Sequence, residues 1–324
     1  MTTPFRVLIS DSMSSRAQEI LSASPAVQCD VRAGISAEEL AECIGEYNGL
    51  LVRSRTKVSA EILERAGKLK VIGRAGIGVD NIDVGVASAR GILVENAPKG
   101  NIITTAEHAI CLLLALVRNI PAGTSSMKDN RWEKKKLEGT EIYGKTFGVV
   151  GLGNIGRIVA DLGSGLRMKV IACDPQIDKE SADKLGVELV SFAQLLERSH
   201  FISIHTPLVD STRGLIGQAE FAKMREGAFL VNAARGGIVD EEACLAALES
   251  GRLAGAAFDV FVTEPAPENH PLVQHPKVIC TPHLGASTAE AQIKVAEDVA
   301  NQMVAYAESG AVINALNESS IAKN

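Results

Sequence analysis

The sequence predicts an α/β protein with two doubly wound parallel sheets. Short apolar segments alternate with segments of helical periodicity along most of the chain, which is typical of parallel strands joined by crossover helices. The apolar segments of the second half show no polar alternation, as expected of strands that helices cover on both faces. The chain has 324 residues, more than one hydrophobic core usually organises. We therefore expect two domains.

The first domain is expected to begin with five strands separated by helices. These strands are predicted over residues 7–9, 28–31, 49–52, 70–73 and 92–95. The turn-rich residues 97–101 follow, and a long apolar helix is predicted from about 104 to 118. We interpret this turn and helix as the crossing into the second domain.

The second domain is expected to contain a further series of strands. They are predicted over residues 146–150, 169–173, 201–205, 228–232, 254–258 and 278–281. A helical pattern over residues 288–308 comes after the last of them and has no strand left to follow. We expect this helix to return to the first domain.

Composition and charge exclude several classes of partner. The formal net charge of -6 creates no field that attracts nucleic acid or an anionic membrane. The N-terminal sequence lacks the apolar core of a signal peptide, and the longest apolar run, residues 109–117, is too short to span a bilayer. The six cysteines form no CxxC pair, and most lie in apolar runs like buried small hydrophobic residues. We expect a cytoplasmic protein that binds neither nucleic acid nor membrane and holds no metal.

A glycine-rich sequence predicts a dinucleotide site. Gly151-Leu152-Gly153-Asn154-Ile155-Gly156 follows the predicted strand 146–150 and opens a helix that runs to about Leu166. The three glycines allow a tight turn, close approach of the backbone to a pyrophosphate, and close packing of helix on strand. Asp174 ends the next strand, where a carboxylate accepts hydrogen bonds from an adenosine ribose and repels a 2′-phosphate. This pattern favours NAD over NADP, and FAD is less expected because its fingerprint usually lies at the start of a chain; the alternative is a glycine turn beside a solvated aspartate.

Polar residues follow the later strands of the second series. They occur in His205-Thr206-Pro207, Asn232-Ala233-Ala234-Arg235-Gly236, Phe258-Asp259 and Thr281-Pro282-His283. Ligands of open α/β sheets bind at these carboxyl edges. A single histidine after a strand is more often structural than catalytic, but His283 is accompanied by the other polar strand ends.

These motifs resemble those of the D-isomer-specific 2-hydroxyacid dehydrogenases. GLGNIG, NAARGGIVDEEACL, FDVFVTEP and TPHLGAS occur in the order of that family. The resemblance implies that Arg235 binds the substrate carboxylate and polarises the C2 oxygen, that His283 exchanges the hydroxyl proton, and that Glu264 hydrogen-bonds to His283. Two alternatives stay open, because Arg235 can instead pair with Asp240, and Glu264 lies in a loop where solvated carboxylates are common.

The cofactor implied by these motifs is NAD, in a Rossmann domain. We expect it to contact Gly151, Gly153, Asn154, Ile155, Gly156, Asp174, Thr206, Pro207, Ala233, Ala234, Asp259, Gly285 and Ala286.

Three arginines predict an anionic substrate. Arg53 and Arg55 follow one strand of the first domain and Arg74 follows the next, so that their guanidinium groups gather at one sheet edge and suit a phosphate and a carboxylate. The substrate-contacting set is expected to comprise Arg53, Ser54, Arg55, Arg74, Ala75, Gly76, Ile77 and Gly78. Lys134 and Lys135 either form a solvated basic loop or, as the resemblance suggests, reach a substrate, including across a dimer interface.

The resemblance also implies the domain boundaries and the assembly. A flavodoxin-like substrate-binding domain of residues 1–98 and 287–324 would surround the NAD-binding Rossmann domain of residues 99–286. The two crossings form a hinge whose closure excludes water from hydride transfer. Family members pair through the helix predicted near 104–118, so we expect a homodimer or a higher homo-oligomer. Many relatives continue into regulatory domains, and feedback inhibition through such domains is not expected here.

The resemblance implies oxidation of a small phosphorylated 2-hydroxy acid by hydride transfer from C2 to NAD. Reduction of glyoxylate, hydroxypyruvate or another 2-keto acid is the alternative activity. A different class of function is NAD(H) sensing by a binding protein like the carboxy-terminal binding protein corepressors, which share this fold; the cluster of Arg53, Arg55 and Arg74 has no evident purpose in such a protein.

Overall fold

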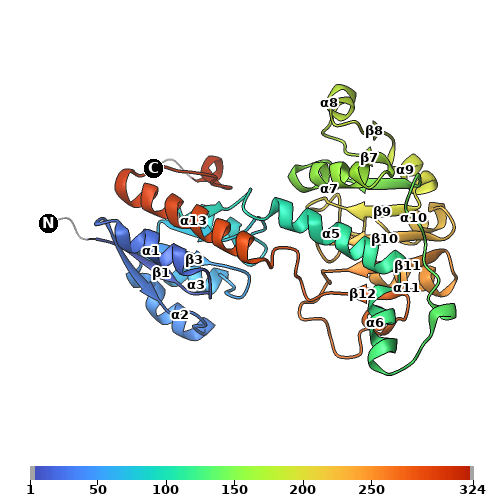
Figure 1. Cartoon of the computed structure of the whole chain (residues 1–324). Coiled ribbons are helices and arrows are strands. Elements are labelled where there is room, and N and C mark those ends of the chain that lie inside the picture. Colours follow the sequence, from blue (N-terminus) through green and yellow to red (C-terminus); the bar gives the residue numbers. More distant parts are fainter. Residues whose placement is uncertain (1–3, 322–324) are drawn as a thin grey trace. The chain divides into compact units, whose positions relative to one another are not determined.

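The computed structural model describes residues 4–321, which form two compact units (Figure 1). The first unit combines the chain up to Asn101 with the chain from Ala286 onward, and the second unit is Ile102–Gly285. The sequence placed the crossings at 98/99 and 286/287, within a few residues of these positions. The long C-terminal helix belongs to the first unit.

The sheet of the first unit is parallel throughout, with strand order β2-β1-β3-β4-β5. This is the flavodoxin-like order that the resemblance implied. Its strands are β1 (Phe5–Ile9), β2 (Val27–Val31), β3 (Gly49–Val52), β4 (Val71–Arg74) and β5 (Leu93–Asn96). All five predicted strands are present, with bounds shifted by one or two residues where they differ.

Helices cover both faces of this sheet and form one apolar core on each. They are α1 (Ser15–Ala23), α2 (Ala37–Cys43), α3 (Ala60–Arg65), α4 (Val84–Ala89) and α13 (Ala289–Ser309), with short 3-10 turns at η1 (Ile44–Glu46) and η3 (Glu318–Ser320). α1 and α13 lie against one face, where Val295, Val299 and Met303 of α13 are buried among strand residues. α13 thus completes a core that the N-terminal segment leaves open.

The sheet of the second unit is also parallel and has the order β12-β11-β10-β9-β6-β7-β8. It contains the Rossmann order extended by β12. Its strands are β6 (Thr146–Val150), β7 (Lys169–Cys173), β8 (Glu188–Leu189), β9 (Phe201–Ile204), β10 (Ala228–Asn232), β11 (Leu253–Phe258) and β12 (Val278–Cys280). The two-residue β8 was not predicted, because so short a strand carries no apolar run.

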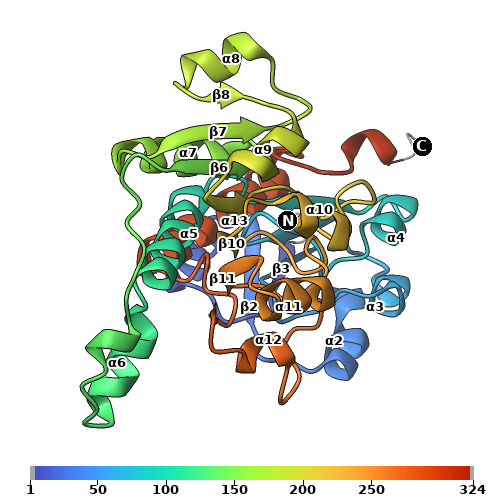
Figure 2. The same ribbon diagram turned by 90° about the vertical axis from the view of Figure 1, so that its right-hand side faces the viewer.

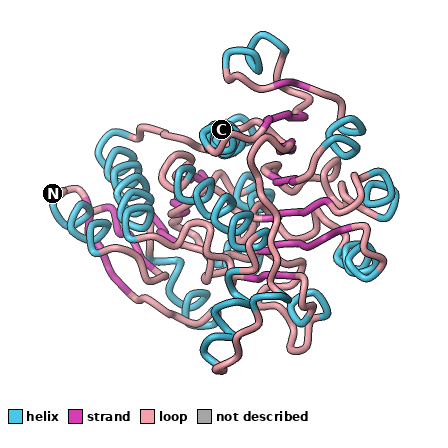
Figure 3. The backbone as a smooth tube through the Cα atoms, turned by 45° about the vertical axis from the view of Figure 1, so that its right-hand side comes forward, coloured by secondary structure: helices cyan, strands magenta, loops and turns pink. Residues whose placement is uncertain are grey.

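The helices of the second unit also lie on both sides of their sheet (Figure 3). They are α5 (Ile102–Val117), α6 (Ile120–Lys128), η2 (Lys134–Lys136), α7 (Asn154–Gly165), α8 (Lys179–Lys184), α9 (Phe192–Arg198), α10 (Gln218–Lys223), α11 (Glu241–Glu249) and α12 (Pro271–Gln274). α5 and α7 share one core, and α9 to α12 share the other. Every strand carboxyl end of this sheet therefore emerges between two helical layers.

The cysteines differ from the expectation of general burial. All six are free, but only Cys244 is buried, while Cys111 on α5 is exposed. Cys173 and Cys280, the last residues of β7 and β12, are half-buried. Among the described residues no single helix is long and apolar enough to cross a membrane. Only α5 and α6 taken together reach the necessary length and apolar composition, and this pair is bent by 62°.

A buried glutamate predicts a pH-dependent stability for the first unit. Glu95 on β5 is 0% exposed, and its Oε1 accepts a hydrogen bond of 2.7 Å from the Ile313 amide. Burial raises its pKa from 4.5 to about 7. The folded state therefore holds this proton more tightly than the unfolded state does. The free energy of unfolding is highest, as far as Glu95 contributes to it, below about pH 4.5, and it falls by about 3 kcal/mol as the pH rises to 7 and above.

Glu95→Gln removes this titration and keeps the oxygen that Ile313 needs. We expect thermal unfolding to show the variant gaining stability relative to the wild type between pH 5 and pH 8. A difference in melting temperature that is the same at both pH values would contradict the prediction.

Candidate active site

The glycine-rich turn between β6 and α7 has the geometry of a pyrophosphate site. Gly151 has a φ of +91°, and a Cβ there would lie 2.8 Å from the His205 carbonyl oxygen. A Cβ on Gly156 would collide with the Gly151 carbonyl, whereas a Cβ on Gly153 would meet nothing within 4 Å. Gly153 is the N-cap of α7, and no N-cap side chain bonds to the first amides of the helix. Such amides bind phosphate oxygens.

Neighbouring strand ends complete the fit to a dinucleotide. Asp174 follows β7, and its Oδ2 accepts a hydrogen bond of 2.7 Å from the Leu152 amide inside the glycine turn. Thr206 follows β9, and its Oγ1 is buried without a hydrogen-bond partner among the described residues. Burial lowers the pKa of the adjacent His205 to about 3, so this ring is neutral. The residues present thus suit NAD, as predicted. The Thr206 hydroxyl, which lies beside the glycine turn, is a polar group that a bound dinucleotide would satisfy.

The loop after β10 carries Arg235. Asn232 fixes this loop, because its amide nitrogen donates to the Arg235 carbonyl at 3.0 Å and its amide oxygen accepts from the Ala234 amide at 3.1 Å. Gly236 allows the loop to touch the chain after β11, since a Cβ there would collide with the Phe261 carbonyl. The structure therefore brings the Arg235 loop against the loop that carries Glu264. Asp240, the alternative partner of Arg235, caps α11 by accepting from the Ala243 amide.

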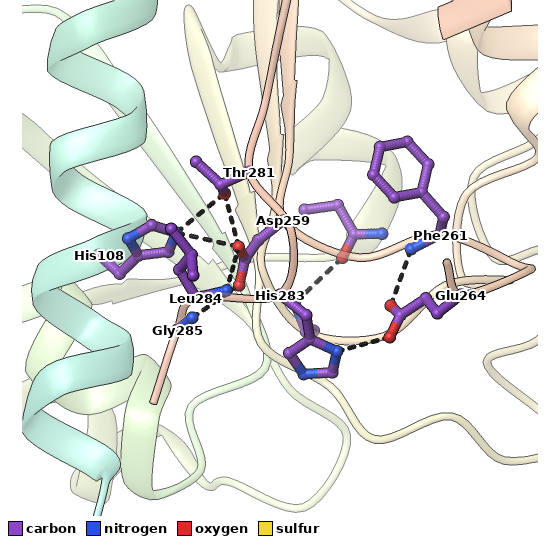
Figure 4. A network of polar contacts seen from close by, with 10 residues as sticks. His108, Asp259, Phe261, Glu264, Thr281, His283, Leu284 and Gly285 are labelled. Atoms are coloured by element: carbon purple, nitrogen blue, oxygen red, sulfur yellow. Dashed lines mark hydrogen bonds and ion pairs between the residues drawn. The ribbon is translucent and has the colours of Figure 1, made fainter. Parts of the chain in front are cut away.

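His283 and Glu264 form a hydrogen bond of 2.7 Å between Nδ1 and Oε2 (Figure 4). The second carboxylate oxygen, Oε1, accepts from the Phe261 amide at 3.1 Å. Burial acts to raise the pKa of Glu264, but the hydrogen bonds from His283 and Phe261 outweigh burial, so the pKa lies below its ordinary value. An ionised Glu264 holds the Nδ1 proton of His283, which leaves Nε2 as the ring atom that can exchange a proton with a substrate.

The backbone of His283 is held in an uncommon conformation. Its φ is +54°, in the left-handed region that residues other than glycine rarely adopt. Its amide donates to the carbonyl oxygens of Asp259 and Thr281 at 2.9 and 3.0 Å. The Asp259 carboxylate accepts from the next two amides, with Leu284 at 2.7 Å and Gly285 at 2.8 Å. Strained conformations of this kind persist where several contacts fix them, and they concentrate at functional sites.

Two residues that the sequence did not single out support the Glu264 loop. Glu241 on α11 accepts from the Val262 amide at 2.9 Å, and its other oxygen lies 3.1 Å from His270 Nε2. The His270 ring packs edge-on against Phe261, with 5.3 Å between ring centroids. Sequence spacing gives no signal for this support, because the contacts join a helix to a distant loop.

In the first unit, Arg53 and Arg74 lie at the carboxyl ends of paired strands. Arg53 follows β3, and Arg74 ends β4 in register with Val52. The buried Asp11 holds the Arg53 loop, since its Oδ2 accepts from the Arg53 amide at 2.6 Å and its Oδ1 accepts from the Thr56 hydroxyl at 2.7 Å. Asp11 was missed from sequence, where it reads as an ordinary turn residue.

The loop after β4 is also fixed. The Arg74 guanidinium occupies the space where a Gly76 side chain would lie, and Gly76 has a φ of +143°. Asn96 at the end of β5 donates to the Ile77 carbonyl at 2.7 Å. Ala75 is buried, and Ile77 and Gly78 are partly exposed. The part of the predicted substrate-contacting set that follows β4 therefore has a defined shape.

Arg55 departs from the predicted cluster. Its Nη2 donates to the Gly34 carbonyl at 3.3 Å, beyond the end of β2. Because β2 and β4 lie on opposite sides of β3, Arg55 is directed away from Arg74, and the expectation of three gathered guanidinium groups is wrong in this respect. Ser54 is exposed beside it.

Lys134 and Lys135 lie in the second unit, in the exposed turn η2. Lys134 lines a surface groove with Met127, Trp132 and Leu137. Their contact with a substrate stays a prediction.

Comparisons with known proteins point in the same direction as this geometry. The family described as D-isomer specific 2-hydroxyacid dehydrogenase, NAD binding domain, matches residues 110–285. A D-3-phosphoglycerate dehydrogenase of Archaeoglobus fulgidus is 46% identical over 316 residues, which cover 98% of this chain and 60% of that protein. The D-3-phosphoglycerate dehydrogenase of Homo sapiens is 47% identical over 299 residues, which cover 92% of this chain and 56% of that protein. The chain thus spans little more than half the length of these curated relatives.

Solved structures match nearly the whole chain. A Thermus thermophilus protein has a TM-score of 0.88 and 32% identity, with 96% of this chain and 99% of that chain covered. A glyoxylate reductase from Paecilomyes thermophila has a TM-score of 0.88 and 30% identity, with 98% of this chain and all of that chain covered.

Proposed function

The chain belongs to the D-isomer specific 2-hydroxyacid dehydrogenase family, and we propose that it oxidises 3-phospho-D-glycerate to 3-phosphohydroxypyruvate with NAD, the first step of L-serine biosynthesis. The observation that carries the proposed chemistry is the 2.7 Å hydrogen bond between His283 and Glu264 beside the Arg235 loop. The relatives named D-3-phosphoglycerate dehydrogenase support this choice of substrate.

The residues of the site have separate roles in this proposal. Bound NAD supplies the acceptor for the hydride that leaves C2. His283 takes the hydroxyl proton as the C2–O bond becomes a carbonyl, so that hydroxy acid and NAD⁺ give keto acid, NADH and one proton. Glu264 stabilises the imidazolium that forms. Arg235 binds the substrate carboxylate and polarises the C2 oxygen.

The experiment follows NADH formation with 3-phosphoglycerate, D-glycerate and D-lactate, each offered separately, together with the reverse reactions of the keto acids. We expect turnover selective for 3-phosphoglycerate and its keto acid. Preference for unphosphorylated acids would overturn the proposed substrate and favour a glyoxylate or hydroxypyruvate reductase. NADH binding without turnover of any of these acids would instead favour a nucleotide-sensing protein.

Arg74 tests the origin of the phosphate preference. We expect Arg74→Ala to raise the KM for 3-phosphoglycerate by about 100-fold, because a charge-assisted bond to the phosphate is lost, and to change the KM for glyoxylate by less than about 3-fold. Steady-state kinetics of both substrates measure this difference. Arg65→Ala is the matched control, since it removes an exposed arginine of α3 in the same unit. Equal losses for both substrates would remove the argument for phosphate binding.

We also infer that the enzyme is a homodimer formed through the segment around α5 and α6. Large apolar side chains are exposed along this segment: Ile103 by 51%, Ile120 by 56%, Met127 by 55%, Trp132 by 79% and Tyr143 by 71%. In Figure 2, α6 extends away from the sheet of its unit. Exposed apolar surface of this kind indicates an interface. Sedimentation velocity should show a dimer, and a lone 34.2 kDa species would contradict it.

We also propose a cytoplasmic location, which the free cysteines support.

A further inference from the structure

A histidine on α5 contacts the residues that hold the His283 turn. His108 is 18% exposed, and its Nε2 lies 3.1 Å from Asp259 Oδ1 and 3.1 Å from Thr281 Oγ1. Asp259 is 1% exposed. Figure 4 shows a network that runs from His108 through Asp259 to the turn of His283 and on to Glu264. All of these residues belong to the second unit.

The hydrogen bonds around Asp259 fix the position of the His108 proton. The Thr281 hydroxyl has a single proton, which it donates to Asp259 Oδ1 at 2.5 Å. The hydroxyl therefore offers His108 an acceptor only, and the carboxylate oxygen is an acceptor as well. His108 Nε2 must carry a proton to satisfy both atoms. His108 is thus a hydrogen-bond donor to the carboxylate.

Asp259 receives donors from three parts of the chain. Oδ1 accepts from His108, Thr281 and the Leu284 amide, and Oδ2 accepts from the Gly285 amide. Burial acts to raise the pKa of Asp259, but the hydrogen bonds from His108, Thr281 and the Leu284 amide outweigh it, so the pKa lies below its ordinary value. The carboxylate stays ionised in a buried place and holds two consecutive amides beyond His283.

We propose that His108 is a positioning residue for His283: its Nε2 proton fixes Asp259 Oδ1, and Asp259 fixes the left-handed turn that directs His283 toward Glu264. This inference rests on the proposed function, in which His283 exchanges the substrate proton. Packing alone does not require a histidine here, because Ala106, Ala109 and Ile110 already anchor this part of α5 in the core. What the ring contributes is the hydrogen-bond donor at Nε2.

The test compares His108→Leu, which removes the donor, with His108→Gln, whose amide nitrogen reaches close to the place of Nε2. We expect the leucine variant to lower kcat about 10- to 100-fold, a loss of the size seen when groups that orient metal ligands are removed. The KM values for 3-phosphoglycerate and for NAD should each change less than about 3-fold. The glutamine variant should recover kcat to within about 5-fold of the wild type. Glu107→Gln, an exposed change on the same helix, is the control.

Hydrogen exchange provides a readout that needs no turnover. In the NAD-bound protein, a peptide covering residues 282–286 should exchange about 10-fold faster in His108→Leu than in the wild type, and at the wild-type rate in His108→Gln. If the wild type does not oxidise 3-phosphoglycerate, the proposed function fails, while this comparison still decides the role of His108.

Two results would overturn the inference. One is a leucine variant with wild-type kcat and wild-type exchange, and the other is a glutamine variant as impaired as the leucine variant, which would indicate a packing role. Should His108→Leu not fold, His108→Asn replaces it, because its amide is too short to reach Asp259. Equal behaviour of the asparagine and glutamine variants would then reject the donor role.

Discussion

His283→Gln is expected to lower kcat for 3-phosphoglycerate oxidation by about a thousandfold, with NADH affinity changed by less than about 3-fold. The imidazole is the group that takes the hydroxyl proton during hydride transfer, and a positioned general base typically contributes 10²- to 10⁴-fold to a rate. Glutamine keeps a polar side chain of similar reach but does not titrate. Steady-state kinetics give kcat, and fluorescence titration with NADH gives the affinity.

The control for this variant is His275→Gln. His275 precedes β12 in the same unit and accepts from the Lys277 amide, and it has no contact with Glu264 or Asp259 among the described interactions. We expect it to keep nearly full activity. A His283→Gln variant that retains more than about a tenth of the wild-type kcat would show that another group exchanges the proton.

The fold could be predicted from sequence because its strands are continuous apolar runs. Each of the eleven predicted strands overlaps an observed one, since strands buried on both faces leave a signal that needs no knowledge of tertiary contacts. β8 was missed because Glu188 and Leu189 pair with β7 at the sheet edge, where neither residue needs to be buried. The place of α13 was predicted from two observations: no strand follows it in the chain, and the family resemblance assigns residues 287–324 to the first domain.

The site could be predicted as far as its residues follow strand ends. Gly151, Arg235 and His283 each come directly after or shortly after a predicted strand, and parallel topology brings such positions to one edge. The supporting residues on helices, His108 on α5 and Glu241 on α11, follow no such rule. His108 and Thr281 are 173 positions apart, and nothing in the spacing of either residue indicates the other.

Arg55 shows the limit of the same reasoning. Its place after β3 indicated the correct sheet edge, but the direction of a long side chain depends on the loop conformation. That conformation is fixed by hydrogen bonds from Asn81 to the carbonyls of Arg53 and Thr56, each 2.7 Å long. These bonds join the loop after β3 to the loop after β4, and they become visible only in the folded structure.

Arg235→Lys is expected to lower kcat/KM for 3-phosphoglycerate by about a hundred- to a thousandfold. Lysine keeps the positive charge but loses the planar pair of donors that a carboxylate and the adjacent C2 oxygen both need. Loss of one donor to a charge that develops in a transition state typically costs about 3 to 4 kcal/mol. Arg252→Lys, which changes an arginine that precedes β11 and donates to the Met224 carbonyl, is the matched control.

The division of this loss between kcat and KM decides what Arg235 does. Binding of the substrate carboxylate alone is made equally in the ground state and the transition state, so its loss raises KM and leaves kcat unchanged. Polarisation of the C2 oxygen strengthens as the carbonyl forms, so its loss lowers kcat. The proposed dual role requires both parameters to change in Arg235→Lys. A wild-type kcat would confine Arg235 to carboxylate binding, and wild-type values of both parameters would remove it from the site.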